Sequence, residues 1–207
     1  MSVSLSGISQ VNETTCYHEA GHAVMARLFG RQVHYIMLLN VENTYNGYTD
    51  WGRDEHFRDW DPNIPYDELK LQQRDCEIGV ALVFAAGKAA ERIWYRRRNL
   101  DESLASFGSS GGKNNDEYQL EKELEGLKHP VLQTPRVKLE QIASAKQEIE
   151  DLATRLLGHK VCWQVVETIA KALLKKLQEQ PGGVTMKDVQ ANIAEVFKKA
   201  AQEEKNS

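Results

Sequence analysis

The chain has 207 residues, enough for one compact domain with a sizeable hydrophobic core. Its formal net charge of −4 and its pI near 5.9 argue against a nucleic-acid backbone as partner. Apolar residues make up 41% of the chain, so we expect a folded protein rather than a disordered one. The three cysteines, Cys16, Cys76 and Cys162, are widely separated, which excludes a disulfide framework and a thiolate zinc site and predicts a reducing, cytoplasmic location.

No targeting or membrane segment is predicted. Residues 1–10 lack the basic region and apolar core of a secretory signal. The longest apolar run, residues 78–87, is much shorter than the ~20 residues that cross a bilayer. We therefore expect a soluble protein with no membrane span.

The first predicted helix carries the most informative motif. Residues 1–11 are expected to form a loose Ser-rich arm, and residues 13–29 predict a helix with Asn12 as its N-cap and Gly30 after its end. Within it, His18 and His22 are four residues apart, so they lie on one helical face and can offer two imidazole nitrogens to one metal ion. Glu19 lies beside them and can act on a water molecule that the metal holds. The spacing favours zinc with a third protein ligand and one position open for water.

A β-hairpin and a loop are predicted next. Residues 33–41 are rich in β-branched and aromatic residues and predict a strand; Asn46-Gly47 predicts a turn, and residues 48–51 a returning strand. We interpret His34 as a polar residue on the open face of the first strand. Residues 52–65 are polar and contain two prolines, which favours a loop that is either a lid over a substrate or a solvated connection.

A long helix is predicted from residue 65 to residue 98. Its middle, residues 76–93, is apolar and rich in small side chains, which indicates the buried centre of the domain. Glu91 lies on this buried helix and needs a partner, which a metal-ligating His would supply through its other ring N–H. The arginines at 96–98 favour a solvated helix end over a binding patch.

The Gly/Ser/Asn loop at residues 107–115 does not fit a phosphate-binding loop. Phe107 replaces the required first Gly, and Asn114 replaces the final Ser or Thr. The loop leads to Asp116 at the start of another helix. There the helix dipole favours a negative charge, and the acid can cap the first turn.

The last third of the chain predicts three helices. They span residues 134–158, residues 161–179, and a segment from Thr185 to residue 201 that Thr185 and Asp188 open as a capping pair. We expect an antiparallel helical bundle packed on the metal-bearing half.

Spacing alone does not choose the third metal ligand. Residues 25–32 contain no His, so the longer metalloprotease pattern is absent and the ligand must come from a distant segment, with a carboxylate the expected type. The candidates are His34, His56, Glu91, Asp116, His129 and His159.

Four stretches resemble, in order, the peptidase domain of the FtsH family of membrane-bound, ATP-dependent zinc proteases. Residues 17–24, Tyr-His-Glu-Ala-Gly-His-Ala-Val, resemble its zinc helix, and residues 46–49, Asn-Gly-Tyr-Thr, its Leu-Gly-Tyr-Thr hairpin. Residues 86–91, Ala-Gly-Lys-Ala-Ala-Glu, resemble its Gly-Gly-Arg-Ala-Ala-Glu helix. Residues 112–116, Gly-Lys-Asn-Asn-Asp, resemble its Gly-Ala-Ser-Asn-Asp. The resemblance covers roughly residues 13–125 well. Ala86 departs from the family's first Gly, and the family's transmembrane helices and ATPase module have no counterpart in this sequence.

The resemblance implies a zinc ion held by His18, His22 and Asp116, Glu19 as general base, and Glu91 as a residue that orients a zinc ligand. It implies one mainly α-helical metallopeptidase domain over residues 1–207, with a metal-site half at 1–128, a small hairpin near the zinc helix and a C-terminal helical part at 129–207.

The function that follows is a zinc-dependent endopeptidase that cuts unfolded proteins or peptides without ATP. By resemblance it would form a hexamer or work with a separate ATPase. The alternative is a non-catalytic zinc-binding or peptide-binding regulator derived from such a peptidase. Retention of Glu19 favours the enzyme, because a structural zinc site fills all four positions and needs no base.

Overall fold

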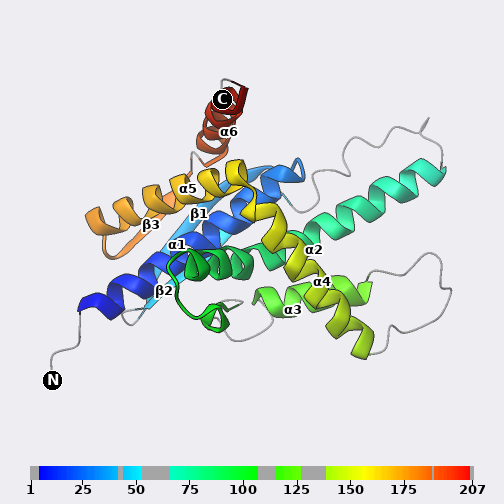
Figure 1. Ribbon diagram of the computed structural model, residues 1–207, viewed down its shortest axis with the longest axis horizontal. Coiled ribbons are helices and arrows are strands. Elements are labelled where there is room, and N and C mark those ends of the chain that lie inside the picture. The colour runs from blue at the N-terminus through cyan, green and yellow to red at the C-terminus, as the bar shows by residue number, and fades with distance from the viewer. Residues whose placement is uncertain are drawn as a thin grey trace.

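The computed structural model describes residues 5–41, 44–52, 66–106, 115–126, 139–187 and 189–205. Within these residues the protein is mainly helical and has a small three-stranded antiparallel sheet, which confirms the predicted fold class (Figure 1). The helices are α1 (Leu5–Leu28), α2 (Tyr66–Arg97), α3 (Asp116–Gly126), α4 (Leu139–Gly158), α5 (Lys160–Glu179) and α6 (Val189–Lys205), with a short 3-10 helix η2 (Glu102–Leu104). The strands are β1 (Val33–Val41), β2 (Thr44–Trp51) and β3 (Gly183–Met186).

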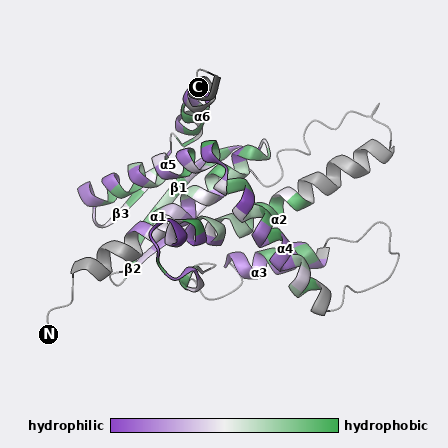
Figure 2. Ribbon diagram, in the orientation of Figure 1, coloured by the Kyte–Doolittle hydropathy of each residue, from purple (hydrophilic) through white to green (hydrophobic). Residues whose placement is uncertain are grey.

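Helix α1 lies at the centre and contacts α2, α5 and β2. Its contact with α2 is so close that a Cβ atom on Gly21 would lie 2.6 Å from the Ala86 carbonyl oxygen and 2.7 Å from the Ala90 Cβ. Gly21 is therefore required for this approach. Figure 2 shows hydrophobic residues concentrated on α2 where it meets α4, whereas hydrophilic residues dominate α3. The small, apolar character of α2 thus places the motif-bearing part of α1 inside the core.

The start of α1 differs from the prediction. The helix begins at Leu5, so Asn12 lies within it and is not its N-cap, and residues 5–11 do not form a loose arm. Serine lowers helix propensity only slightly, so a Ser-rich composition does not stop a helix that continues into a packed segment. The predicted end is confirmed: Gly30 has φ of 68°, and the Arg31 N–H donates to the Ala26 carbonyl at 2.9 Å, as in a Schellman motif.

The sheet has the strand order β2-β1-β3. The predicted first strand is confirmed, but Asn46-Gly47 lies inside β2, opposite Leu39 and Leu38, and is not the hairpin turn. The connection at residues 42–43 lies outside the described residues. Gly47 is required for a different reason: a Cβ atom there would lie 2.2 Å from Glu19 Oε1, so the glycine marks a close approach of strand and helix.

The third strand was not predicted. Thr185 pairs with Met37 of β1 and does not cap the last helix, which begins at Val189. Val184 and Met186 on either side of it are buried, so the short alternation of apolar and polar residues follows a strand period. Residue 188 lies outside the described residues. Pairing with β1 and the burial of these two side chains therefore outweigh the local capping pattern.

The C-terminal helices pack on the N-terminal helices α1 and α2. Helix α4 packs on α2, where Lys88 Nζ and Glu150 Oε2 are 2.9 Å apart and Arg92 reaches Asp151 at 3.4 Å. Helix α5 packs on α1, with the Tyr17 and Trp163 rings stacked at 5.6 Å, and α6 packs on α5. The ends of α2 and α4 at Arg97 and Gly158, and the span of α5, agree with the prediction within a residue or two; residues 131–138 lie outside the described part.

None of the helices in the described part of the chain combines the length and apolar character that a membrane-spanning helix needs.

Candidate metal centre

Three side chains from two distant segments meet at one point. His18 and His22 come from adjacent turns of α1, and Asp116 is the first residue of α3. The Nε2 atoms of His18 and His22 lie 3.0 Å and 2.9 Å from the same oxygen, Asp116 Oδ2. Both imidazoles are buried, and all three potential ligand atoms lie within 4.8 Å of one another. The structure therefore brings together the three residues that the resemblance to the FtsH family implies as ligands.

The second nitrogen of each ring has its own partner. His22 Nδ1 lies 2.6 Å from the Val83 carbonyl oxygen, which can only accept, so this nitrogen carries a proton and donates. His18 Nδ1 donates to Glu91 Oε1 at 2.8 Å in the same way. In the neutral tautomers both Nε2 atoms are thus left with lone pairs that face the carboxylate oxygen of Asp116. Three lone pairs that converge this closely need a cation or extra protons between them, so the residues fit a bound metal ion.

The electrostatics of the metal-free group support the same conclusion. Burial lowers the pKa of His18, but the hydrogen bonds with Asp116 and Glu91 outweigh it and hold this pKa well above 6.5. Burial also lowers the pKa of His22, and the charge and hydrogen bond of Asp116 bring the net result above its usual value. The same two histidines hold the pKa of the Asp116 carboxyl well below its usual range, although burial raises it. A divalent cation would displace the extra protons from both rings.

Glu91 holds His18 and also the backbone at Ser106. One of its oxygens accepts from His18, and the other accepts from the Ser106 N–H at 2.9 Å. Ser106 is the last described residue before the segment that leads to Asp116. The ring of His18 also lies against α2, because a Cβ atom on Gly87 would be 2.3 Å from His18 Nε2. The role predicted for Glu91, orientation of a metal ligand, agrees with this geometry.

Asp116 is positioned by the N-terminus of α3. Asn115 precedes it, and the Asn115 side chain accepts a hydrogen bond from the Tyr118 N–H at 2.7 Å, as an N-cap does. The side chains of Leu120 and Leu124 are buried in the core. Lys146 of α4 forms ion pairs with Glu117 and Glu121 of α3. The Gly/Ser/Asn loop that precedes the helix lies, from residue 107 to 114, outside the described residues.

Glu19 is buried beside the group formed by His18, His22 and Asp116 but does not belong to it. Its carboxylate accepts a hydrogen bond from Thr49 Oγ1 of β2 at 2.6 Å. Burial raises the pKa of Glu19 above its usual value, and the nearby His22 and His18 and the Thr49 hydrogen bond oppose that rise. A carboxylate with a raised pKa is suited to accept a proton and release it again.

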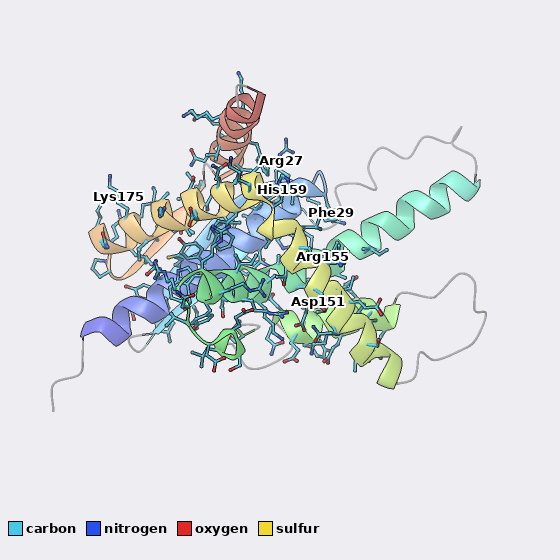
Figure 3. The ribbon with its side chains drawn as sticks, in the orientation of Figure 1. Arg27, Phe29, Asp151, Arg155, His159 and Lys175 are labelled. Carbon is cyan, nitrogen blue, oxygen red and sulfur yellow. The ribbon has the colours of Figure 1, made fainter. Side chains whose placement is uncertain are left out.

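The other ligand candidates in the described residues are engaged elsewhere or lie on the surface. His34 is exposed on β1 and bonds to Asp50 at 3.0 Å, which agrees with its interpretation as a polar residue on the strand. His159 is exposed at the junction of α4 and α5 (Figure 3). His56 and His129 lie outside the described residues. Within the described part of the chain, His18, His22 and Asp116 form the group of three that could hold a metal ion.

Two participants were not predicted from the sequence. The Val83 carbonyl that orients His22 is a backbone group, and no side-chain pattern could point to it. Thr49 lies within the Asn-Gly-Tyr-Thr stretch already noted for its resemblance, but its contact with Glu19 joins residues 30 positions apart.

The sequence matches no protein-family model, and no curated protein shows significant similarity to it. The site is therefore interpreted from its own geometry.

Proposed function

We propose that this protein is a zinc-dependent endopeptidase that hydrolyses unfolded proteins or peptides. The observation that carries the proposal is the convergence of two imidazole Nε2 atoms on the Asp116 carboxylate while both Nδ1 atoms are hydrogen-bonded elsewhere. A buried carboxylate, Glu19, lies next to this group without being part of it. Three protein ligands and an adjacent base favour a catalytic zinc site over a structural one, which has four protein ligands.

In this proposal His18, His22 and Asp116 hold the ion. A zinc ion held there would supply Lewis-acid chemistry, which would polarise a scissile carbonyl and lower the pKa of water to about 7. Glu19 accepts a proton from the attacking water and then delivers it to the leaving amine. Strand β2 lies at the edge of the sheet, next to Glu19, and an extended peptide could pair with it through backbone hydrogen bonds. Backbone pairing of this kind supports a broad substrate range and favours unfolded chains.

The proposed partners rest on the resemblance to the FtsH family. The resemblance implies a cytoplasmic hexamer or a complex with a separate ATPase. Only the ATPase would allow folded substrates to be cut, because extraction of a chain from a fold requires work that the metal centre does not supply. The net charge of −4 gives no support to a nucleic-acid partner.

The test compares the zinc-loaded wild-type chain with Glu19→Gln and a control. Glu19→Gln should bind zinc as the wild type does and lose cleavage of unfolded casein by about 100-fold or more, because general-base catalysis contributes about 10²–10⁴-fold. The control, Glu13→Gln, lies on the same helix and pairs with Arg98 away from the metal group, so it should keep activity.

Cleavage by Glu19→Gln at the wild-type rate rejects the base. A zinc-loaded wild type that cleaves neither casein nor peptides rejects the enzyme in favour of a non-catalytic zinc-binding or peptide-binding regulator.

A further inference from the structure

We propose that Thr49 of β2 positions the Glu19 carboxylate for proton transfer, an inference that rests on the proposed peptidase function. Thr49 is 7% exposed and lies on the face of the strand that packs against α1. Its hydroxyl lies 2.6 Å from Glu19 Oε2 and 3.1 Å from the Glu19 backbone oxygen. One hydroxyl group therefore touches both the reactive end of Glu19 and the helix that carries it.

The other carboxylate oxygen is fixed by the same strand. Gly47 precedes Thr49 by two residues, so both face the same side of β2. A Cβ atom on Gly47 would lie 2.2 Å from Glu19 Oε1, which means that this oxygen occupies the space above the glycine backbone. Glu19 is thus held by a hydrogen bond on one oxygen and by steric contact on the other. This arrangement leaves the carboxylate little freedom to rotate in a buried position.

The Thr49 hydroxyl can hold Glu19 in both protonation states, because Oε2 accepts a hydrogen bond as a carboxylate oxygen and as the carbonyl oxygen of the neutral acid. While Glu19 is ionised, the hydroxyl donates to Oε2, the closer of its two acceptors. After Glu19 has taken a proton from water on its other oxygen, Oε2 is the carbonyl oxygen of the neutral acid and still accepts from the Thr49 hydroxyl, while the proton remains available to the leaving amine. The contact between the two side chains then persists through the proton transfer, and no buried polar atom loses its partner.

The experiment uses the zinc-loaded full chain and four proteins: wild type, Thr49→Val, Thr49→Ser and Thr154→Val. Valine keeps the shape of threonine and removes the hydroxyl, whereas serine keeps the hydroxyl. Thr154 is the matched control, since it is also buried and its hydroxyl donates to a backbone oxygen, that of Glu150 on α4, at 2.8 Å. Cleavage of labelled, unfolded casein gives kcat and KM, and zinc content is measured for each protein.

We expect Thr49→Val to keep its zinc and a KM within about twofold of wild type, while kcat falls about 10- to 100-fold, as for the loss of one hydrogen bond to a charged group. Thr49→Ser should restore kcat to within about threefold of wild type, and Thr154→Val should leave it unchanged. A kcat of Thr49→Val equal to that of wild type overturns the proposal, as does an equal loss in Thr154→Val.

Crystal structures of zinc-loaded wild type and Thr49→Val supply a readout that does not depend on activity. Displacement of the Glu19 carboxylate in Thr49→Val, with the three metal ligands in place, supports the positioning role. An unmoved carboxylate overturns it, even if the wild type proves inactive and the peptidase proposal itself fails. Should Thr49→Val not fold, Thr49→Ala removes the same hydroxyl and is measured in the same two ways.

Discussion

The two parts of the candidate metal centre are held in different ways. His18 and His22 lie on α1, which the core surrounds, and each ring donates a hydrogen bond to an acceptor on α2. Asp116 lies on the first turn of α3, a helix of 11 residues whose main contacts are with α2 and α4. The comparison indicates that the histidine pair is preorganised by the core, whereas the third ligand depends on the docking of a short peripheral helix. Zinc affinity should therefore respond more steeply to changes around the histidines.

The largest effect is expected from loss of a histidine. His18→Ala removes a ligand and leaves the Glu91 carboxylate buried without its His18 partner, so zinc affinity should fall about 1,000-fold or more and the metal-free protein should lose stability. Asp116→Ala should cost less affinity, because this side chain is partly exposed and water can replace it. Competition with a chromogenic zinc chelator measures both. An equal or larger loss in Asp116→Ala would contradict the proposed asymmetry.

Protons should compete with zinc at His18 and His22 but not at Asp116. The pKa values of His18 and His22 are raised, so without metal these rings remain protonated above pH 6.5, while Asp116, with its lowered pKa, stays ionised. Zinc affinity should therefore already fall with decreasing pH above 6.5, and by about 10-fold or more per pH unit below 6.5, because zinc must displace the extra proton of each ring.

The stability of the metal-free protein should depend on pH in the opposite direction to its zinc affinity. Raised histidine pKa values stabilise the fold fully below 6.5, and this contribution disappears as pH rises through the raised values. The lowered pKa of Asp116 stabilises the fold above about 3.8 and is lost as pH falls through the lowered value. Thermal unfolding with chelator should show higher stability at about pH 6 than at about pH 9, and the Tm increase on zinc addition should be larger at about pH 8 than at about pH 6. A Tm increase independent of pH would contradict the assignment of the ligands.

Part of this centre could be predicted from the sequence because it depends on local geometry. The i, i+4 spacing of His18 and His22 requires only a helix, and the apolar character of α2 required that it be buried. The third ligand is a tertiary contact over 94 residues from His22, and spacing left six candidates until the resemblance singled out Asp116.

Two of the wrong predictions, the turn at Asn46-Gly47 and the cap at Thr185, have a common physical origin. Asn46-Gly47 and Thr185 both have strong local preferences, for a turn and a helix cap, yet both lie in strands. In each case a tertiary contact decided the conformation: the approach of Glu19 to Gly47, and the pairing of Thr185 with β1. Propensity is a weak preference that packing routinely overrides.

An intermediate effect is expected where α2 supports His18. A Cβ atom on Gly87 would lie 2.3 Å from His18 Nε2, so Gly87→Ala should displace the ring and lower zinc affinity about 10-fold. The control is Gly158→Ala on α4, where the nearest atom to the new Cβ would be 4.0 Å away. It should leave zinc affinity unchanged and add about 0.5–1 kcal/mol of stability, because alanine restricts the unfolded chain. Equal zinc affinities in the two variants would show that the ring does not depend on this contact.

The smallest effect is expected at the N-terminus of α3. Asn115→Ala removes the hydrogen bond to the Tyr118 N–H, a cap worth about 1 kcal/mol, so zinc affinity should fall about fivefold. Asn115→Asp keeps an acceptor at this position and should retain most of the affinity. Calorimetric titration with zinc distinguishes the two. A loss of zinc affinity in Asn115→Ala as large as that in His18→Ala would contradict the proposal that zinc affinity depends more on the histidine pair than on α3.

The most direct test of the central claim is a crystal structure of the zinc-loaded protein with anomalous diffraction data at the zinc absorption edge. We expect one zinc ion within about 2.2 Å of His18 Nε2, His22 Nε2 and an Asp116 carboxylate oxygen, with an open position facing Glu19. A zinc ion bound elsewhere, or a protein that binds no zinc while His18, His22 and Asp116 keep their present contacts, would contradict it.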